Sequence, residues 1–363
     1  MTEDHGEARQ VQVDVAIVGG GIAGLWTLSL LRQHGYNAIL LENNSLGSGQ
    51  TRYAQGIIHG GTKYALTGKL TASSEAIAKM PSFWRSCLQG KGELDLSGVR
   101  LMSEHQYMWS TASLTSRMAG FFASHAMRSR TQALSESERP VIFQDKQFKG
   151  QVYKLDEPVL DTSSLVSALA EMNRNHLVAI KRLAANDNVL RVTDIDGDNY
   201  SINARHVVLT AGKGNEALLG VFGKQLPKMQ LRPLKMVMLR GGLPEMIYAH
   251  CLGASVNPRI TITSHKDSNG EIVWYLGGQL AEEGVPRTDE AQINEAKKEL
   301  ANETDNAVSV CWPTKLAFAP RLANRLLKQI QEQGISASGE QVLPSWSQPE
   351  VAKLPWQEEE LWS

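Results

Sequence analysis

Cysteine is scarce in this sequence. Only Cys87, Cys251 and Cys311 occur in 363 residues, and no two of them form a C-x-x-C pair. A disulfide framework or a structural zinc site needs paired or closely spaced cysteines. We therefore expect reduced, packed thiols and no metal site.

Charge imbalance and long apolar runs are also absent. The formal net charge is −1 without a long basic block, which argues against a protein that binds nucleic acid through phosphate contacts. No apolar run approaches the roughly 20 residues that span a bilayer, and the polar start, Met1 to Gln10, does not resemble a secretory signal. We expect a cytoplasmic protein, with peripheral contact at the inner face of the membrane left open.

Glycine, in contrast, is concentrated where a strongly apolar stretch ends. Val13 to Val18 has the β-branched and apolar character of a strand buried on both faces. Gly19, Gly21 and Gly24 follow at G-x-G-x-x-G spacing, which allows a tight turn, a close approach to a pyrophosphate and close packing of the next helix. That helix, beginning at Ile22, would direct its N-terminus at a phosphate.

A second apolar run ends in an acidic residue. Ala38 to Leu41 is followed by Glu42, close to the offset of roughly 20 residues at which a carboxylate accepts the hydrogen bonds of an adenosine ribose. A carboxylate there would repel a 2′-phosphate, so FAD or NAD is favoured over NADP. The register of strand, glycines, helix, strand and acid indicates a dinucleotide-binding unit rather than an ordinary tight turn.

Later segments suggest how the rest of the chain is arranged. The polar, glycine-rich stretch from Asn43 to Tyr64 is too long for a simple turn, and we expect it to line a ligand. Gly150 to Leu160 reads as a strand, and Arg205 to Leu209 as another, ending at a glycine junction that could close over the same cofactor. Short strands alternate with turns from Leu231 to Leu280, as in the antiparallel sheet of a second lobe.

Four stretches resemble the D-amino-acid oxidase superfamily of flavoproteins, which includes glycine oxidase, sarcosine oxidase, 2-hydroxyglutarate dehydrogenase and FAD-linked glycerol-3-phosphate dehydrogenase. They are Asp14 to Gly24, Glu42, Tyr153 to Leu169 and Ala204 to Gly212. The resemblance implies an α/β fold, in which a Rossmann-type FAD-binding lobe is combined with a discontinuous, mainly antiparallel-sheet substrate lobe. The implied FAD lobe comprises residues 11–95 and 161–225, the substrate lobe residues 96–160 and 226–312, and residues 313–363 return to the FAD lobe and form a C-terminal tail.

The resemblance implies FAD as the cofactor. Relatives with a covalent flavin carry a histidine where Tyr53 stands, so we expect FAD to be bound non-covalently. The residues that the resemblance places around it are Gly19, Gly21, Ile22, Ala23, Gly24, Glu42, Asn43, Ser48, Gly49, Gln50, Thr51, Gln55, Gly56, Val178, Ala211 and Gly212.

The stretch Ile57 to Tyr64 most resembles the Leu-Leu-His-Gly-Gly-x-Arg-Tyr segment of glycerol-3-phosphate dehydrogenases. By that match His59 would lie near the flavin, and Lys63 would replace an arginine that helps to bind the substrate phosphate. A lysine lacks the bidentate fork of arginine, so a carboxylate substrate fits equally well. The resemblance makes Arg321 a further candidate for anion binding, on the strand by which such chains return to the FAD lobe. The alternative is a plain charge at the start of a helix.

The resemblance implies an FAD-dependent oxidoreductase, a dehydrogenase or an oxidase, that oxidises a small anionic 2-hydroxy acid or glycerol 3-phosphate. A hydride would pass to flavin N5 while His59 takes the hydroxyl proton, a role that suits imidazole near neutral pH. Two alternatives stay open: an amine or amino-acid oxidase similar to glycine or sarcosine oxidase, and a non-catalytic flavin-binding homologue that serves as a protein partner. The electron acceptor could be oxygen, a quinone or a carrier protein.

The C-terminal region departs from the family pattern. Relatives return with a glycine-rich turn and a helix that faces the flavin pyrimidine, whereas Gly334 to Val342 offers only two glycines. The tail beyond it carries Trp346, Trp356 and Trp362. We expect these tryptophans to pack along the FAD lobe, with a partner-binding or membrane-surface patch as the alternative.

Overall fold

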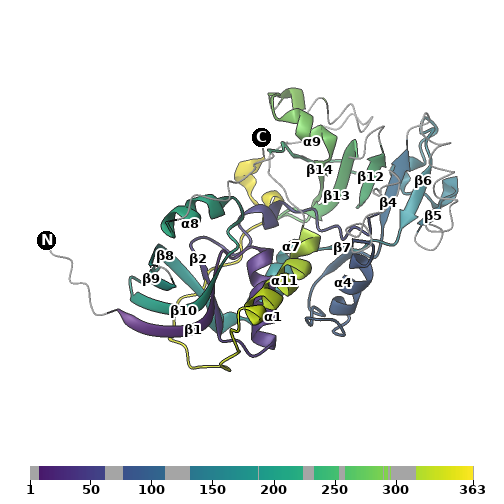
Figure 1. Cartoon of the computed structure of the whole chain (residues 1–363). Coiled ribbons are helices and arrows are strands. Elements are labelled where there is room, and N and C mark those ends of the chain that lie inside the picture. The colour runs from purple at the N-terminus through teal and green to yellow at the C-terminus, as the bar shows by residue number, and fades with distance from the viewer. Residues whose placement is uncertain are drawn as a thin grey trace.

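The computed structural model describes residues 8–61, 77–110, 131–186, 188–223, 233–252, 258–288, 290–292, 295 and 316–362. In this part of the chain the strands form one closed ring, one sheet of seven strands and a separate pair. Helices pack beside the ring and connect it to the larger sheet (Figure 1). The α/β fold expected from the sequence is confirmed.

The first sheet holds the glycine motif. Its strands are β1 (Arg9–Val18), β2 (Ala38–Glu42), β8 (Leu177–Asn186), β9 (Val189–Asp194) and β10 (Asn199–Leu209). β1 lies parallel between β2 and β10, β2 is parallel to β8, and antiparallel pairing through β9 closes the ring. The last six residues of β1 are buried, as expected for a strand that is covered on both faces.

Three helices share one apolar core with β1 and β2 of this sheet: α1 (Ile22–Gln33), α7 (Thr162–Met172) and α11 (Ala319–Glu332). α1 packs against both of the others and is almost wholly buried, with Trp26 fully enclosed. The Asp161 side chain caps α7 by accepting the N–H of Ser164 at 2.9 Å. Figure 1 shows α1 and α11 lying together at the centre of the molecule.

The second sheet is mainly antiparallel, in the order β11-β14-β13-β12-β4-β6-β5. Its strands are β4 (Gln106–Ser110), β5 (Thr131–Ala133), β6 (Val152–Leu155), β11 (Val237–Arg240), β12 (Ala249–Leu252), β13 (Ile260–Lys266) and β14 (Ile272–Gly277). Only the β12–β4 pair is parallel. The smaller elements are β3 (Leu101–Ser103), β7 (Val159–Leu160), α4 (Met80–Leu88), α8 (Asn215–Val221), α9 (Gln279–Gly284) and η1, a 3₁₀ turn (Gln50–Tyr53).

The strand predicted over residues 150–160 is interrupted. β6 ends at Leu155 and β7 begins at Val159, because Pro158 has no N–H to donate and restricts the residue before it. β7 pairs with β3 instead of continuing in the larger sheet. The interruption leaves Glu157 outside both ladders, with its side chain buried.

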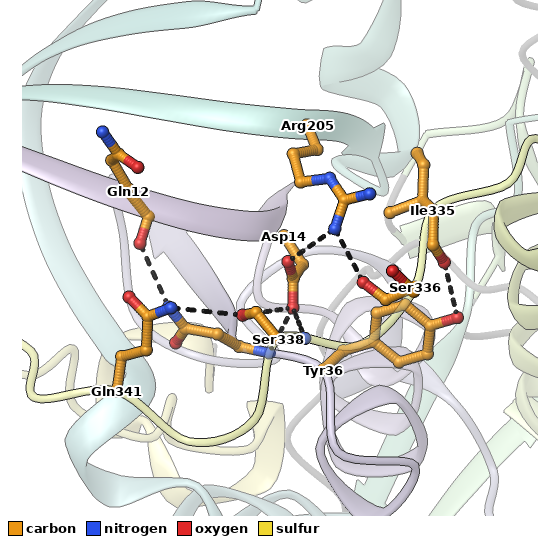
Figure 2. A network of polar contacts seen from close by, with 9 residues as sticks. Gln12, Asp14, Tyr36, Arg205, Ile335, Ser336, Ser338 and Gln341 are labelled. Carbon is orange, nitrogen blue, oxygen red and sulfur yellow. Dashed lines mark hydrogen bonds and ion pairs between the residues drawn. The ribbon is translucent and has the colours of Figure 1, made fainter.

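Asp14, near the middle of β1 and 2% exposed, holds the segment that follows α11 (Figure 2). Its Oδ2 accepts the N–H groups of Asn37 and Ser338, both at 2.9 Å, and its Oδ1 accepts Arg205 at 3.2 Å. Burial alone would raise the pKa of Asp14, but these hydrogen bonds together lower it below its ordinary value of 3.8. The carboxylate thereby ties the chain beyond α11 to the first two parallel strands.

The tail after this anchor joins the two sheets. Trp346 meets Tyr200 of β10 edge to face at 5.9 Å, as expected for packing along the first sheet. Trp356 instead stacks at 3.6 Å on His265 of β13, where burial lowers the pKa of the histidine to about 3. Glu358 then pairs with Arg52 at 2.6 Å. The guanidinium of Arg240, in β11, lies over the Trp362 ring at 4.2 Å. Of the three tail tryptophans, Trp346 therefore packs along the first sheet as expected, and the other two lie at the second.

Cys87 and Cys251 are buried and form no disulfide, as expected, and Cys311 lies outside the described residues.

Candidate functional site

Gly19 and Gly24 form the tight junction between β1 and α1. Gly19 has φ +115°, and a Cβ there would lie 2.5 Å from the backbone nitrogen of Ala211. A Cβ on Gly24 would overlap the carbonyl oxygen of Gly19 and lie 2.7 Å from Thr210 Oγ1. The backbones of β1, β10 and α1 therefore approach closely, as the third glycine of such a motif allows.

Space opens beside the same turn at Gly21 and Gly49. A Cβ built on Gly21 would have a single described neighbour within 4 Å, Thr51 Oγ1 at 3.4 Å. A Cβ built on Gly49 would have no described neighbour within 4 Å. The Thr51 hydroxyl also accepts the N–H of Ile22 at 3.0 Å, in the first turn of α1. A helix N-terminus with open space beside it suits a pyrophosphate. These residues fit the FAD that the sequence predicts.

Glu42 stands at the end of β2, against the glycine turn. Its carboxylate accepts the N–H of Gly20 at 2.5 Å and that of Asn44 at 2.8 Å. In the neighbouring strand β8, Val178 lies opposite Leu41, and its side chain is buried, so only its backbone can face a ligand. Ligands of α/β folds bind beyond the carboxyl ends of parallel strands, and this edge fits the adenosine half of FAD.

The second glycine junction lies against the first, as the sequence predicts. The Thr210 N–H donates to Val18 at 2.8 Å, and its hydroxyl donates to the carbonyl of Gly19 at 2.8 Å. The Gln50 side chain lies 3.7 Å from the position of a Cβ on Gly212. The predicted cofactor residues on these turns and strand ends are Gly19, Gly21, Ile22, Ala23, Gly24, Glu42, Asn43, Ser48, Gly49, Gln50, Thr51, Val178, Ala211 and Gly212. Their contact with FAD stays a prediction.

The loop after η1 leads from the glycine turns to the second sheet. Gln55 donates to the carbonyl of Tyr275, in β14, at 3.2 Å. Gly56 has φ +72°, and its carbonyl accepts the N–H of Leu160 in β7 at 2.9 Å. A Cβ on Gly56 would overlap the Leu160 carbonyl oxygen. The loop is thus held by β14 of the second sheet and by β7 of the separate pair.

This loop presents His59 beside a buried carboxylate. His59 Nδ1 lies 3.3 Å from Glu157 Oε2, and the N–H of Gly60 donates to Glu157 Oε1 at 2.7 Å. The Gln106 side chain, from β4, also donates to Glu157 Oε2. The His59 side chain is 36% exposed and that of Glu157 only 5%. An accessible imidazole therefore rests on an enclosed acid.

A second histidine joins this group. His250, on β12, meets the His59 ring edge to face with ring centroids 5.1 Å apart. Burial alone would raise the pKa of Glu157, but the hydrogen bond and charge of His59, the amide of Gly60 and the charge of His250 more than offset that effect. The pKa of Glu157 lies below its ordinary value, so the carboxyl group is ionised at neutral pH.

Of the two predicted substrate-binding residues, Arg321 lies in the described part of the chain and Lys63 does not. Lys63 lies within residues 62–76, outside the described residues. Arg321 is exposed in the first turn of α11, a helix and not the returning strand that the resemblance implied. Pro320 suits that first turn, and apolar residues follow at helical spacing. Anion binding by either residue stays a prediction.

Sequence reasoning missed three members of the group. Glu157 could have been found, since an acidic residue followed by Pro158 interrupts an otherwise apolar strand pattern. Gln106 and His250 carried no local signal. They reach the loop only because β4 and β12 pair across a long sequence separation.

Neither a membrane span nor a metal cluster is found where the structure can be described. There, no helix has both the length and the hydropathy to cross a membrane. No group of three or more His, Cys, Asp or Glu side chains in the same residues could hold a metal ion.

Comparison with known proteins gives consistent results. The family model described as FAD dependent oxidoreductase matches residues 14–313. A probable FAD-dependent oxidoreductase of Pseudomonas aeruginosa is 44% identical over an alignment that covers 96% of this chain and 98% of the relative. The crystal structure of that protein superimposes with a TM-score of 0.81, over 96% of this chain and 99% of that one.

More distant matches differ in what their names describe. Glycerol-3-phosphate dehydrogenase 1 of Mycobacterium tuberculosis is 25% identical over 244 residues, which cover 61% of this chain and 44% of the relative. Glycine oxidase from Geobacillus kaustophilus has a TM-score of 0.60 at 12% identity, over 94% of this chain and 99% of that one. The second likeness shows the fold alone.

Proposed function

The chain belongs to the family of FAD dependent oxidoreductases, within the D-amino-acid oxidase superfamily, and from this premise we propose that it oxidises the hydroxyl group of a small anionic substrate. The substrate class is a 2-hydroxy acid or glycerol 3-phosphate. The observation that carries the proposal is the setting of His59, an accessible imidazole on a glycine-flanked loop, backed by the buried carboxylate of Glu157.

His59 acts in this proposal as the general base. It accepts the hydroxyl proton of the substrate at Nε2 while the carbon–oxygen single bond becomes a carbonyl. Bound FAD supplies the acceptor for the hydride that leaves the same carbon. Gly19, Gly21 and Gly24 would hold its pyrophosphate, and Glu42 its ribose, from the turn and strand end described above.

Two features favour an alcohol over an amine as substrate. Once an amine is neutral, its oxidation needs no further base, whereas oxidation of a hydroxyl group requires a base that takes the proton as the carbonyl forms, the role that suits a histidine backed by a carboxylate. The sequence similarity to a glycerol-3-phosphate dehydrogenase also points to a hydroxyl substrate, whereas glycine oxidase shares only the fold. A glycine- or sarcosine-oxidase-like activity remains the second candidate.

The experiment is an anaerobic titration of the FAD-loaded protein, followed by its visible spectrum. Glycerol 3-phosphate, a series of 2-hydroxy acids, glycine and sarcosine are added separately. We expect the flavin absorbance to bleach with a member of the first two groups. Bleaching by glycine or sarcosine alone would assign the amine reaction, and a yellow protein that none of the compounds bleaches would favour a non-catalytic flavin-binding partner. Mixing the reduced protein with oxygen or a quinone then identifies the electron acceptor.

A further inference from the structure

We propose that Glu157 is a positioning residue for His59: its carboxylate holds the imidazole with the proton on Nδ1, which leaves Nε2 as the proton acceptor. This inference rests on the proposed function, because it assigns a role to the residue behind the general base.

Glu157 directs its side chain into the interior from the segment between β6 and β7. It lies in the interruption between β6 and β7, where the following proline prevents either ladder from continuing. Its backbone N–H donates to the carbonyl of Leu155 at 2.9 Å. The side chain therefore enters the interior from a fixed backbone, in contrast to Asp156, which is 63% exposed and pairs with Arg85 at 2.6 Å.

The contacts of the carboxylate determine the tautomer of His59. Oε1 accepts the N–H of Gly60, and Oε2 accepts the side-chain amide of Gln106. An ionised carboxylate has no proton to donate. At 3.3 Å from Oε2, His59 Nδ1 can form a hydrogen bond only as the donor. Neutral His59 must then carry its second nitrogen unprotonated, as a base requires.

The charges around the ring support the same arrangement during the reaction. Two titratable groups contact the His59 ring in the described structure, Glu157 through its carboxylate and His250 edge to face. When His59 accepts a proton at Nε2 it becomes a cation, and the buried carboxylate behind it stabilises that charge. The His250 ring meets it edge to face and does not separate it from Glu157.

Glu157→Gln is the informative variant, because the site can accommodate it. The new amide oxygen can still accept the N–H of Gly60. Gln106 Oε1 is buried without a hydrogen-bond partner among the described residues, so this amide can turn over and accept the new N–H₂ group. That same group would donate to His59 Nδ1 and force the ring proton onto Nε2, the tautomer that cannot act as base.

The first readout is the tautomer itself, independent of catalysis. Proton–nitrogen correlation spectra of histidine-labelled protein distinguish the two neutral forms, and His59→Gln identifies the signal. We expect Nδ1–H in the wild type, Nε2–H in Glu157→Gln and no change in the matched control Asp156→Asn. Nε2–H in the wild type would overturn the inference even if Glu157→Gln did not fold.

The second readout is the anaerobic rate of flavin reduction, with glycerol 3-phosphate or the 2-hydroxy acid that bleaches the flavin. We expect Glu157→Gln to lower the rate constant about 10²- to 10⁴-fold, the contribution of a general base, because the wrong tautomer removes that base, with KM nearly unchanged. Glu157→Asp keeps the charge and is expected to lie between the two. A folded Glu157→Gln protein with the wild-type rate would show that the residue only supports the loop.

The two proposals fail in different ways. If no hydroxyl substrate reduces the flavin, the proposed function fails, while the tautomer measurement still decides whether Glu157 positions His59. If His59→Gln abolishes reduction but Glu157→Gln changes neither rate nor tautomer, the base is correct and the positioning role is wrong.

Discussion

Two glycines three residues apart in one motif are expected to respond to alanine in opposite ways. A Cβ on Gly24 would overlap the carbonyl oxygen of Gly19 and approach Leu40 Cδ1 to 3.2 Å. α1 would have to move away from β1, and overpacking of this kind costs about 1–3 kcal/mol or more. Gly21 has φ −74°, which alanine adopts readily. A Cβ there meets nothing closer than 3.4 Å, so we expect at most a small loss, about 0.5 kcal/mol, as for alanine at an N-cap.

For FAD affinity, the substitution expected to matter directly is the one at Gly21. The Gly21 Cβ would enter the open space that we assign to the pyrophosphate, so Gly21→Ala should weaken FAD at least about tenfold, or ~1.4 kcal/mol, in a protein whose apo form is nearly as stable as the wild type. Urea unfolding of the apo proteins measures the first effect, and quenching of FAD fluorescence on titration measures the second. Stability of Gly24→Ala equal to the wild type, or FAD affinity of Gly21→Ala equal to the wild type, would refute this assignment of roles.

Three further perturbations test other parts of the structure. Trp356→Ala removes a ring that is 2% exposed and should lower the free energy of unfolding in urea by about 3–5 kcal/mol, whereas Val342→Ala, at a fully exposed side chain, should change it by less than about 0.5 kcal/mol. Asp14 has a lowered pKa in the folded state, so its stabilisation is complete above the ordinary value of 3.8 and is lost as the pH falls below that value. Asp14→Asn should accordingly be less stable than the wild type at pH 7, by about 2 kcal/mol, and the difference should vanish in acid. Glu42→Gln should weaken FAD by about 1–2 kcal/mol in the fluorescence titration, and an unchanged affinity would argue against a ribose contact.

The first parallel strands and the glycine turns could be predicted from the sequence because their signals are local. An apolar strand, three glycines at fixed spacing and the acid at the end of β2 all lie within residues 13–42. The structure shows the physical reason for two of the glycines, whose missing Cβ atoms permit contact with Thr210 and Ala211 of the distant junction. The position of that junction was predicted too, since it repeats the strand-to-glycine pattern.

The group around His59 could be predicted only in part. The loop that presents His59 is marked by its own glycines, but Gln106 and His250 arrive on β4 and β12, strands that are far apart in sequence and adjacent in the sheet. Pairing of this kind depends on the whole sheet, and spacing along the chain does not report it. The course of the tail carried no local signal either. Trp356 stacks on His265 of the second sheet, a contact that depends on how distant parts of the chain are arranged.

Arg321 illustrates a different limit. The resemblance placed it on a strand, but the segment from Ala319 to Glu332 has strong helical periodicity and a proline in its first turn. The alternative expectation, a charge at the start of a helix, is the one that the structure bears out.

The most direct test of the central claim is the anaerobic rate of flavin reduction in His59→Gln, measured by stopped flow with the hydroxyl substrate that bleaches the wild-type protein. A general base contributes about 10²- to 10⁴-fold, so we expect a loss of that size in a protein that still binds FAD with wild-type affinity. If His59→Gln were reduced at the wild-type rate, His59 would not be the base that accepts the hydroxyl proton.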